Sequence, residues 1–179
     1  LIVVHLGGGI TVGLHHNGKV IDVNNGLDGE GPFSPERTGT LPVGDLTRLC
    51  FSGNYQLHEI KKMITGKGGF VAYLGTNDAY QVEVAAFKEN DEKAKEVFYA
   101  MAYQIAKEIG ALAPVVSGKV DAVLITGGMA RSKQICEYLE DKVAFIAPVV
   151  FYPGEDEMQA LTEGVFYGMK GEIQINDYI

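Results

Sequence analysis

Two glycine-rich segments are the parts of this sequence whose residue types most directly suit a chemical task. Gly7-Gly8-Gly9 follows the apolar run Leu1–Leu6, and Gly127-Gly128 follows the apolar run Asp121–Thr126. Glycine has no Cβ atom, so the backbone N–H groups of such turns can approach a phosphate closely. Either segment alone is equally typical of an ordinary turn after a strand. Two such turns in one domain favour a nucleotide site that both of them line.

A single arginine, Arg37, lies in a loop that we expect over residues 26–41 and that is rich in Gly, Pro, Ser and Thr. A guanidinium can bind a phosphoryl group through two hydrogen bonds and stays charged at any working pH. The alternative is a surface arginine paired with Glu36 or Glu30. Loops of this length are usually functional or disordered. Arg37 is therefore a candidate phosphate ligand.

An acidic cluster follows Pro153-Gly154 near the end of the sequence. Glu155, Asp156 and Glu157 begin a helix that we expect over residues 155–169. Carboxylates in the first turn of a helix are favoured simply because they oppose the helix dipole. The functional alternative is that one of them supports Mg²⁺ through a water molecule. These residues alone leave both interpretations open.

The composition is that of an acidic globular domain. The chain has 179 residues, of which 46% are hydrophobic and 21% charged, and this length suits one domain or one and a half small ones. Asp and Glu total 23 against 15 Lys and Arg, which gives a formal charge of −8. Nucleic acid and acidic membrane surfaces are bound through a positive surface. We therefore expect neither as a partner.

The cysteines and the longest apolar runs bear on the cellular setting. Cys50 and Cys136 form no CxxC motif, which predicts small buried apolar groups in a reducing cytoplasm. Val143–Tyr152 is among the longest apolar runs and is too short to span a bilayer. The sequence begins without Met, on residues typical of a strand interior, so we expect a fragment of a longer cytoplasmic protein.

Hydrophobic periodicity and turn residues predict a regular order of strands and helices. Asn17-Gly18 is typical of a type I′ hairpin turn, because both central residues of that turn need positive φ. The helix over 92–112 is the clearest, since its apolar residues recur at steps of three and four. Expected strands are 1–6, 10–16, 19–24, 121–126 and 143–151, expected helices are 42–51, 57–65, 78–88, 92–112, 132–139 and 155–169, and a loop is expected over 66–75.

Three antiparallel strands followed by two strand–helix units predict an α/β fold with a mixed sheet and helices on both of its faces. This order is similar to that of the ribonuclease H-like domain of the actin, hexokinase and sugar-kinase superfamily. A fold of this kind does not by itself define an activity. Function must therefore be argued from the glycine turns, the arginine and the acidic cluster.

Four segments resemble the acetate and butyrate kinase family. They are His5-Leu-Gly-Gly-Gly, the block from Asp28 through Pro-Phe-Ser-Pro-Glu-Arg to Gly39, Ile125-Thr-Gly-Gly, and Pro153-Gly-Glu-Asp-Glu-Met-Gln-Ala-Leu. The resemblance extends over essentially all 179 residues. Gly8 replaces the Asn of acetate kinases, and Pro35-Glu-Arg-Thr-Gly-Thr replaces their Gly-Thr-Arg-Ser-Gly-Asp. These departures favour butyrate or a branched short-chain acid over acetate as the acceptor.

The resemblance implies a reversible, Mg²⁺-dependent transfer of the ATP γ-phosphoryl group to a short-chain fatty acid, which gives ADP and an acyl phosphate. It implies that Gly7, Gly8 and Gly9 form the phosphate-binding hairpin and that Gly127 and Gly128 form the adenosine-side loop. Arg37 matches the arginine that stabilises the transferring phosphoryl group. Glu157 matches the acid placed near Mg²⁺.

Members of the family consist of two duplicated halves with the active site between them, and this sequence resembles only the second half. The His-Gly-Thr-Ser-His segment of the first half is absent from it. We therefore expect residues 1–179 to form a C-terminal nucleotide-binding domain, with 26–41 as an active-site loop and 42–113 as a mostly helical insertion. Its expected partners are the absent N-terminal domain and other copies in a homo-oligomer, and we expect the chain alone to be inactive.

Two alternatives to this interpretation remain. One is a kinase for another short or branched acid, namely isobutyrate, propionate or acetate. The other belongs to a different class, a non-catalytic nucleotide-binding or interaction module with the same fold. An upstream reading frame that carries the missing motifs would argue against the second alternative.

Overall fold

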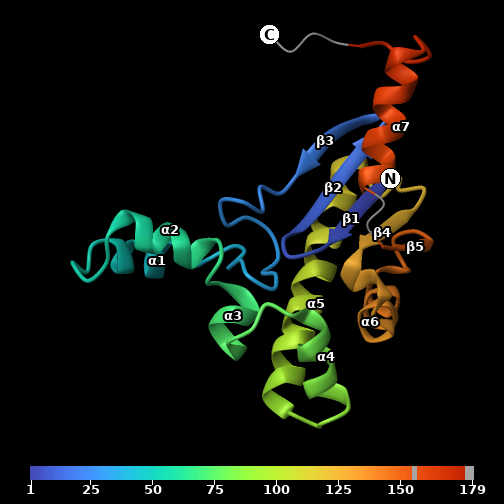
Figure 1. The fold of residues 1–179 in the computed structure, drawn as a ribbon. Coiled ribbons are helices and arrows are strands. Elements are labelled where there is room, and N and C mark those ends of the chain that lie inside the picture. Colours follow the sequence, from blue (N-terminus) through green and yellow to red (C-terminus); the bar gives the residue numbers. More distant parts are fainter. Residues whose placement is uncertain (155–156, 176–179) are drawn as a thin grey trace.

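A mixed five-stranded sheet forms the centre of the molecule (Figure 1). The computed structural model describes residues 1–154 and 157–175, and of Glu157 only the backbone. The strands are β1 (Ile2–Leu6), β2 (Ile10–His16), β3 (Lys19–Val23), β4 (Val123–Gly127) and β5 (Val149–Pro153). Their order across the sheet is β3-β2-β1-β4-β5. The expected α/β fold with a mixed sheet is thereby confirmed.

The first three strands form the expected antiparallel meander, in which β2 pairs with both β1 and β3. Asn17 and Gly18, with φ of 50° and 75°, make the tight turn between β2 and β3. Positive φ at both positions is what the Asn-Gly pair predicts. The triple-glycine turn joins β1 to β2 at the opposite end of the meander.

β4 and β5 extend the sheet in parallel with β1. Val4 of β1 lies beside Ile125 of β4, and Ile125 lies beside Phe151 of β5. Parallel strands run in one direction, so their carboxyl ends meet at one edge of the sheet. The glycine turn after β1 and the glycine turn after β4 therefore lie at the same edge.

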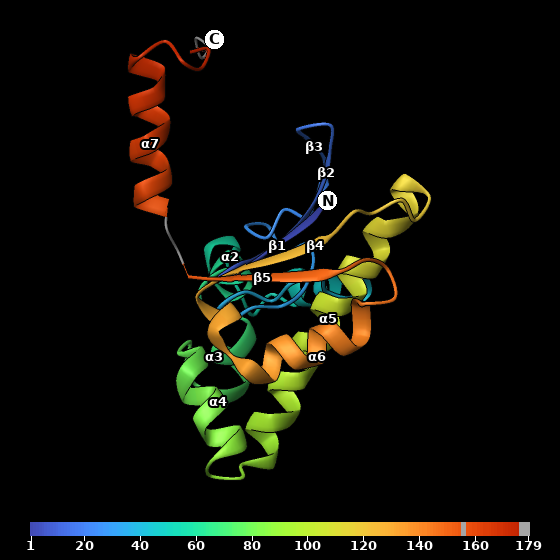
Figure 2. The ribbon, with the colours of Figure 1, turned by 90° about the vertical axis from the view of Figure 1, so that its right-hand side faces the viewer.

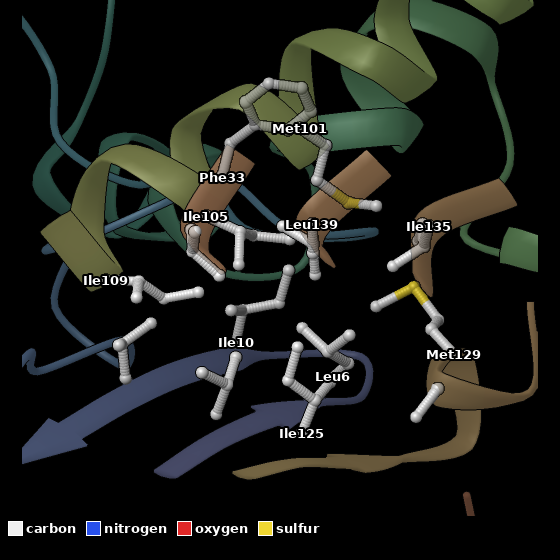
Figure 3. Close-up of a cluster of buried hydrophobic side chains, with 14 of the residues drawn as sticks. Leu6, Ile10, Phe33, Met101, Ile105, Ile109, Ile125, Met129, Ile135 and Leu139 are labelled. Carbon is white, nitrogen blue, oxygen red and sulfur yellow. The ribbon is translucent and has the colours of Figure 1, made fainter. Parts of the chain in front are cut away.

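One face of the sheet is buried under two helices, α5 (Glu92–Leu112) and α6 (Lys133–Val143) (Figure 3). Full burial of a large apolar side chain contributes about 1.5–3 kcal/mol to stability. This core holds the strand ends that carry the two glycine turns. The side chains that meet here include Leu6, Ile10 and Ile125 from the strands, and Met101, Ile105 and Ile109 from α5.

The segment between β3 and β4 contains the five α-helices α1 to α5 and the short 3₁₀ helix η1 (Ala113–Val116). α1 (Val43–Cys50) buries none of its residues, and α2 (Leu57–Ile64) buries only Ile60. Both project away from the sheet in Figure 1. α4 (Ala79–Phe87) packs against α5 and begins at Asp78, whose side chain accepts hydrogen bonds from two backbone N–H groups of its first turn.

The largest differences from the sequence-based expectation concern three elements. Residues 66–75, expected as a loop, contain α3 (Gly69–Leu74). α6 does not end at residue 139 but continues to Val143, which is buried in the core. β5 accordingly begins only at Val149. The apolar run over 143–151 is thus shared between the end of a helix and a strand.

The opposite face of the sheet is less covered (Figure 2). Val3 of β1 and Leu124 of β4 point to this side and are half-buried. α7 (Glu157–Met169) stands apart from the sheet in Figure 2, and Leu161 and Val165 on it are 66% and 64% exposed. Within the described residues, packed helices therefore cover one face of the sheet rather than both.

The two cysteines are less buried than expected. Cys50 is exposed at the end of α1, so its prediction as a buried group is wrong, and Cys136 of α6 is half-buried. Burial, with the negative charge of Glu140, raises the pKa of the Cys136 thiol. None of the helices described here combines the length and the apolar character that a membrane crossing requires.

Candidate functional site

Both glycine turns contribute to one cavity at the carboxyl edge of β1 and β4. The cavity has a volume of about 910 Å³ and is lined by Gly7 and Gly8 from the first turn and by Gly128 from the second. Small-molecule and cofactor sites have volumes of about 300–1,000 Å³. Two turns far apart in the sequence thus face the same space. Its other walls include Pro35, Tyr80, Glu83, Phe87, Ser132 and Ile135.

The first turn offers two backbone donors that no described residue uses. The N–H of Gly7 donates to the carbonyl oxygen of Gly9 at 3.1 Å, whereas the N–H groups of Gly8 and Gly9 have no acceptor among the described residues. Backbone donors of a folded protein rarely stay unpaired unless water or a ligand binds them. Adjacent free N–H groups are what a turn needs to bind an anion.

Space, rather than backbone conformation, explains the glycines of the first turn. None of the three has a positive φ. A Cβ on Gly9 would overlap the guanidinium of Arg37. Gly8 is different, because the nearest atom to its added Cβ would be Oε1 of Glu36, 4.0 Å away. Gly8 is therefore the position at which the turn is open toward the cavity.

Arg37 lies against this turn from behind and does not line the cavity. Its Nε atom is buried and has no hydrogen-bond partner in the part of the chain that the structure describes. The expected alternative, a surface ion pair with Glu36 or Glu30, is not among the ion pairs of the described residues. An unpaired buried donor costs about 1–3 kcal/mol, and native proteins that keep one usually have a functional reason.

The loop that carries Arg37 is held by backbone contacts with the start of α3. The N–H groups of Gly66 and Gly68 both donate to the carbonyl oxygen of Glu36, at 2.7 and 3.2 Å. The buried Ser34 donates from Oγ to the carbonyl oxygen of Gly8 at 2.7 Å. These bonds fix the loop relative to the first glycine turn. These contacts hold residues 34 and 36, which lie just before Arg37 in the chain, and so fix the position of the Arg37 backbone.

The second turn is built differently. Gly127 has a φ of 97°, and a Cβ on it would lie 2.5 Å from the carbonyl oxygen of Leu6 on β1. Its backbone also exchanges two hydrogen bonds of 3.2 Å with Gly154 after β5. Gly127 does not line the cavity, whereas Gly128 does. Of this pair, Gly127 packs closely on the backbone of β1, and Gly128 lines the cavity.

Residues of α4 and α6 that the sequence did not single out form the far wall of the cavity. Glu83 of α4 accepts a hydrogen bond from Oγ of Ser132 at 2.8 Å, and Ser132 also caps the N-terminus of α6. Tyr80, at the start of α4, is 66% exposed. Asp78 shows the N-cap pattern of α4 in the sequence, but nothing there indicates that α4 faces the glycine turns.

The acidic cluster lies mostly outside the described residues. Glu155 and Asp156 are not described, and Glu157 is described only as the backbone that begins α7. The structure therefore does not test the expected role of Glu157 near Mg²⁺. Among the described residues, no group of three or more His, Cys, Asp or Glu side chains could hold a metal ion.

Comparison with known proteins gives one family. A model of the Acetokinase family matches residues 1–147. The chain is 57% identical to Butyrate kinase 2 of Clostridium acetobutylicum over 178 residues, which is 99% of this chain and 50% of that protein. The chain thus spans about half the length of this curated relative.

Solved structures of similar fold come from related kinases. An acetate kinase of Porphyromonas gingivalis has a TM-score of 0.79 at 24% identity and covers 92% of this chain and 48% of that one. A propionate kinase of Francisella tularensis has a TM-score of 0.76 at 22% identity and covers 88% of this chain and 46% of that one. At these identities the likeness establishes the fold alone, and it agrees with the α/β fold with a mixed sheet that the order of the strands and helices predicts.

Proposed function

Because the chain belongs to the acetokinase family, we propose that it is the C-terminal, nucleotide-binding half of a butyrate kinase. The whole enzyme would transfer the γ-phosphoryl group of ATP reversibly to butyrate, giving butyryl phosphate and ADP. The identity with Butyrate kinase 2 supports butyrate over acetate as the acceptor. Within the fold, the observation that supports this proposal most is the cavity that both glycine turns line.

The nucleotide would lie in this cavity with its phosphates at the first glycine turn. The N–H groups of Gly8 and Gly9, which have no acceptor among the described residues, would donate to phosphate oxygens. The base and sugar would extend along α4, where Tyr80 offers an exposed aromatic ring. A chain with a formal charge of −8 must bind phosphate through backbone donors and a few placed cations.

Arg37 would neutralise charge on the transferring phosphoryl group, in addition to three cationic residues that line the cavity, Lys88, Arg131 and Lys133. Phosphoryl transfer is catalysed mainly by positioning and by neutralising charge on the transferring group. The guanidinium of Arg37 already packs on Gly9, and the Arg37 backbone bridges to Thr65. Because the guanidinium does not line the cavity, it would have to move from Gly9 toward the phosphoryl group in order to act on it. The planar fork of an arginine also matches phosphoryl oxygens better than a lysine does.

We further propose that the nucleotide binds as its Mg²⁺ complex. Mg²⁺ would neutralise the β- and γ-phosphate oxygens when bound. The ion commonly takes one or two carboxylates together with substrate phosphates rather than a cage made wholly of protein. Two of the residues that line the cavity, Asp78 and Glu83, carry carboxylates. Glu157, the first residue of α7, would orient one of the waters of the ion.

The acyl acceptor would be bound mainly by an N-terminal half that this chain does not include. The chain spans 50% of Butyrate kinase 2, which leaves the length of a second domain. Leu161 and Val165 on α7 are more than half exposed, as apolar side chains at an interface with another domain would be in its absence. We also propose that the whole protein is cytoplasmic and forms a homo-oligomer.

The test is an activity assay on the full-length reading frame that contains this chain. The protein is supplied with MgATP and butyrate, isobutyrate, propionate or acetate, and the acyl phosphate is trapped with hydroxylamine. We expect the highest kcat/KM with butyrate. A higher value with another acid would assign the enzyme to that acid, and no acyl phosphate from any of them would favour the non-catalytic module.

The 179-residue chain alone provides the matching control. It should release no ADP in response to butyrate, because the groups of the N-terminal half that would hold the acceptor are missing. Even misplacement of a reacting group by about 1 Å can cost 10²-fold in rate. Mixing it with the separately produced N-terminal half should restore part of the activity. Turnover by the chain alone at about 1–100 s⁻¹, the range of whole kinases, would contradict the two-half proposal.

A further inference from the structure

Glu36 lies beside the open position of the first glycine turn. Its Oε1 is the one heavy atom found within 4.0 Å of the point where a Cβ on Gly8 would stand. The next residue, Arg37, lies against Gly9. Two neighbouring residues of opposite charge therefore flank the two backbone donors of the turn. The negative one lies nearest Gly8, which lines the cavity, although Glu36 itself is not among the lining residues.

The backbone of Glu36 is fixed more firmly than that of an ordinary loop residue. Its carbonyl oxygen accepts two hydrogen bonds, from the N–H groups of Gly66 and Gly68. A Cβ on Gly68 would lie 2.5 Å from the backbone nitrogen of Thr38, so this contact requires glycine. The position from which the Glu36 side chain extends is therefore set by packing.

The side chain of Glu36 is oriented as well. Nδ2 of Asn77 donates to Oε2 at 3.2 Å, and Asn77 lines the cavity immediately before α4. The other oxygen, Oε1, is left on the side of Gly8. No Lys or Arg forms an ion pair with Glu36 in the described ranges 1–154 and 157–175. A carboxylate without an ion pair among the described residues thus stands next to the turn that we propose binds phosphate.

A carboxylate in this position opposes the binding of a bare polyphosphate, because like charges at short range repel. The same carboxylate is favourable when a divalent cation accompanies the phosphates. We propose that Glu36 makes this site select the Mg²⁺ complex of the nucleotide and reject the metal-free nucleotide. This inference rests on the proposed nucleotide site, and Glu36 is a specificity-determining residue in it rather than a catalytic one.

The experiment measures ADP binding to the full-length protein by calorimetry, with excess MgCl₂ and separately with EDTA. We expect the wild-type protein to bind MgADP at least about tenfold more tightly than metal-free ADP. Glu36→Gln keeps the shape and the hydrogen bond from Asn77 in reach but removes the charge. Its ratio should fall to about threefold or less, because binding of metal-free ADP becomes stronger.

Two further variants separate charge from structure. Glu36→Asp keeps the charge and should keep most of the Mg²⁺ preference. Glu30→Gln removes a carboxylate from the same loop, one that accepts a hydrogen bond from the Asn25 N–H and is not the carboxylate found near Gly8. It should leave the ratio unchanged. Thermal unfolding of each variant without nucleotide shows that the fold is retained.

The possible outcomes distinguish this inference from the proposal on which it rests. Binding of both forms with the same Mg²⁺ preference in the wild type and in Glu36→Gln would overturn the selection by Glu36 alone. An equal loss of preference in Glu30→Gln would overturn it too, since any loop charge would then suffice. No binding of either form by the wild type would overturn the nucleotide site and this inference together.

Discussion

The turn after β1 and the turn after β4 face the same cavity, but their glycines meet different surroundings. In the first turn the backbone angles are ordinary, and Gly8 has open space where a side chain would begin. In the second, Gly127 has a φ of 97° and lies directly on the backbone of Leu6. Glycines in the two turns therefore differ in kind: Gly8 has open space beside it and Gly127 packs closely on β1, and substitutions can distinguish the two situations.

The largest effect is expected at Gly127. Gly127→Val places a β-branched side chain at positive φ and against the carbonyl group of Leu6, so we expect the free energy of unfolding to fall by more than about 4 kcal/mol. Circular dichroism and thermal unfolding measure this loss. Gly18→Val is the control, because Gly18 has a φ of 75° but open space around it, and only the backbone strain should remain. A Gly127→Val protein as stable as the wild type would contradict the conclusion that close packing on Leu6 requires glycine in the second turn.

The next largest effect concerns Arg37, whose guanidinium lies behind the first turn. In the full-length enzyme, Arg37→Ala should lower kcat by about 10³-fold while the KM for nucleotide changes far less. Arg37→Lys should recover little, because an ammonium group lacks the planar fork. Steady-state kinetics with MgATP and butyrate provide the measurement. Near-normal kcat in Arg37→Ala would leave the residue with a packing role only.

A selective loss of binding is expected at Gly8. The added side chain of Gly8→Val has space in the fold but blocks the approach of phosphate to the free N–H groups. MgADP affinity should fall at least about tenfold, a loss of about 1.4 kcal/mol, with the unfolding temperature nearly unchanged. Gly44→Val on the exposed helix α1 is the matched control for binding. Unaltered affinity in Gly8→Val would remove the first turn from the site.

The smallest expected effect is a change in stability caused by a residue that lies away from both turns. Burial, together with the charges of Asp22 and Glu30, raises the pKa of Glu108 on α5. The folded protein therefore holds this proton more tightly than the unfolded chain, and stability is lost as the pH rises through the raised pKa. Glu108→Gln should stabilise the protein at pH 7 by at most about 1 kcal/mol, since solvent screens the group.

The pH dependence of this effect is its test. As the pH falls toward about 4.3, the ordinary pKa of a glutamate, Glu108 becomes increasingly protonated in both states, so the difference in unfolding temperature between Glu108→Gln and the wild type should shrink. Thermal unfolding between pH 4 and pH 8 gives the measurement. A variant less stable than the wild type at pH 7 would show that the carboxylate has a favourable contact.

Much of the fold follows from local patterns in the sequence. The Asn17-Gly18 turn and the helix over Glu92–Leu112 are confirmed, because a turn dipeptide and a long periodic helix carry their own signals. α3 could not be predicted in the same way. It is only six residues long, follows two glycines, and is held by backbone contacts with the loop around Ser34.

The candidate site could be predicted only in part. The glycine turns and Arg37 stand out by residue type. The loop that brings Arg37 against the first turn is held by the hydrogen bond from the Gly66 N–H to the carbonyl oxygen of Glu36, and no spacing in the sequence indicates this contact. Glu83 and Ser132 form the far wall through a hydrogen bond between two helices. These two residues form no recognisable motif in the sequence, so this wall of the cavity can be identified only from the positions of the helices in the structure.

The pairing of β1 with β4 also sets an order of events during synthesis. The hairpins of β1, β2 and β3 are local and can close in about 1–10 μs. β4, in contrast, joins β1 only after the whole helical segment between β3 and β4 has been made, and Gly127 must then settle on Leu6. Contacts between such distant segments form slowly. A ribosome-bound chain will thus present the first glycine turn long before it has a cavity, and the nucleotide that we propose as ligand would act on folding only after β4 has been made.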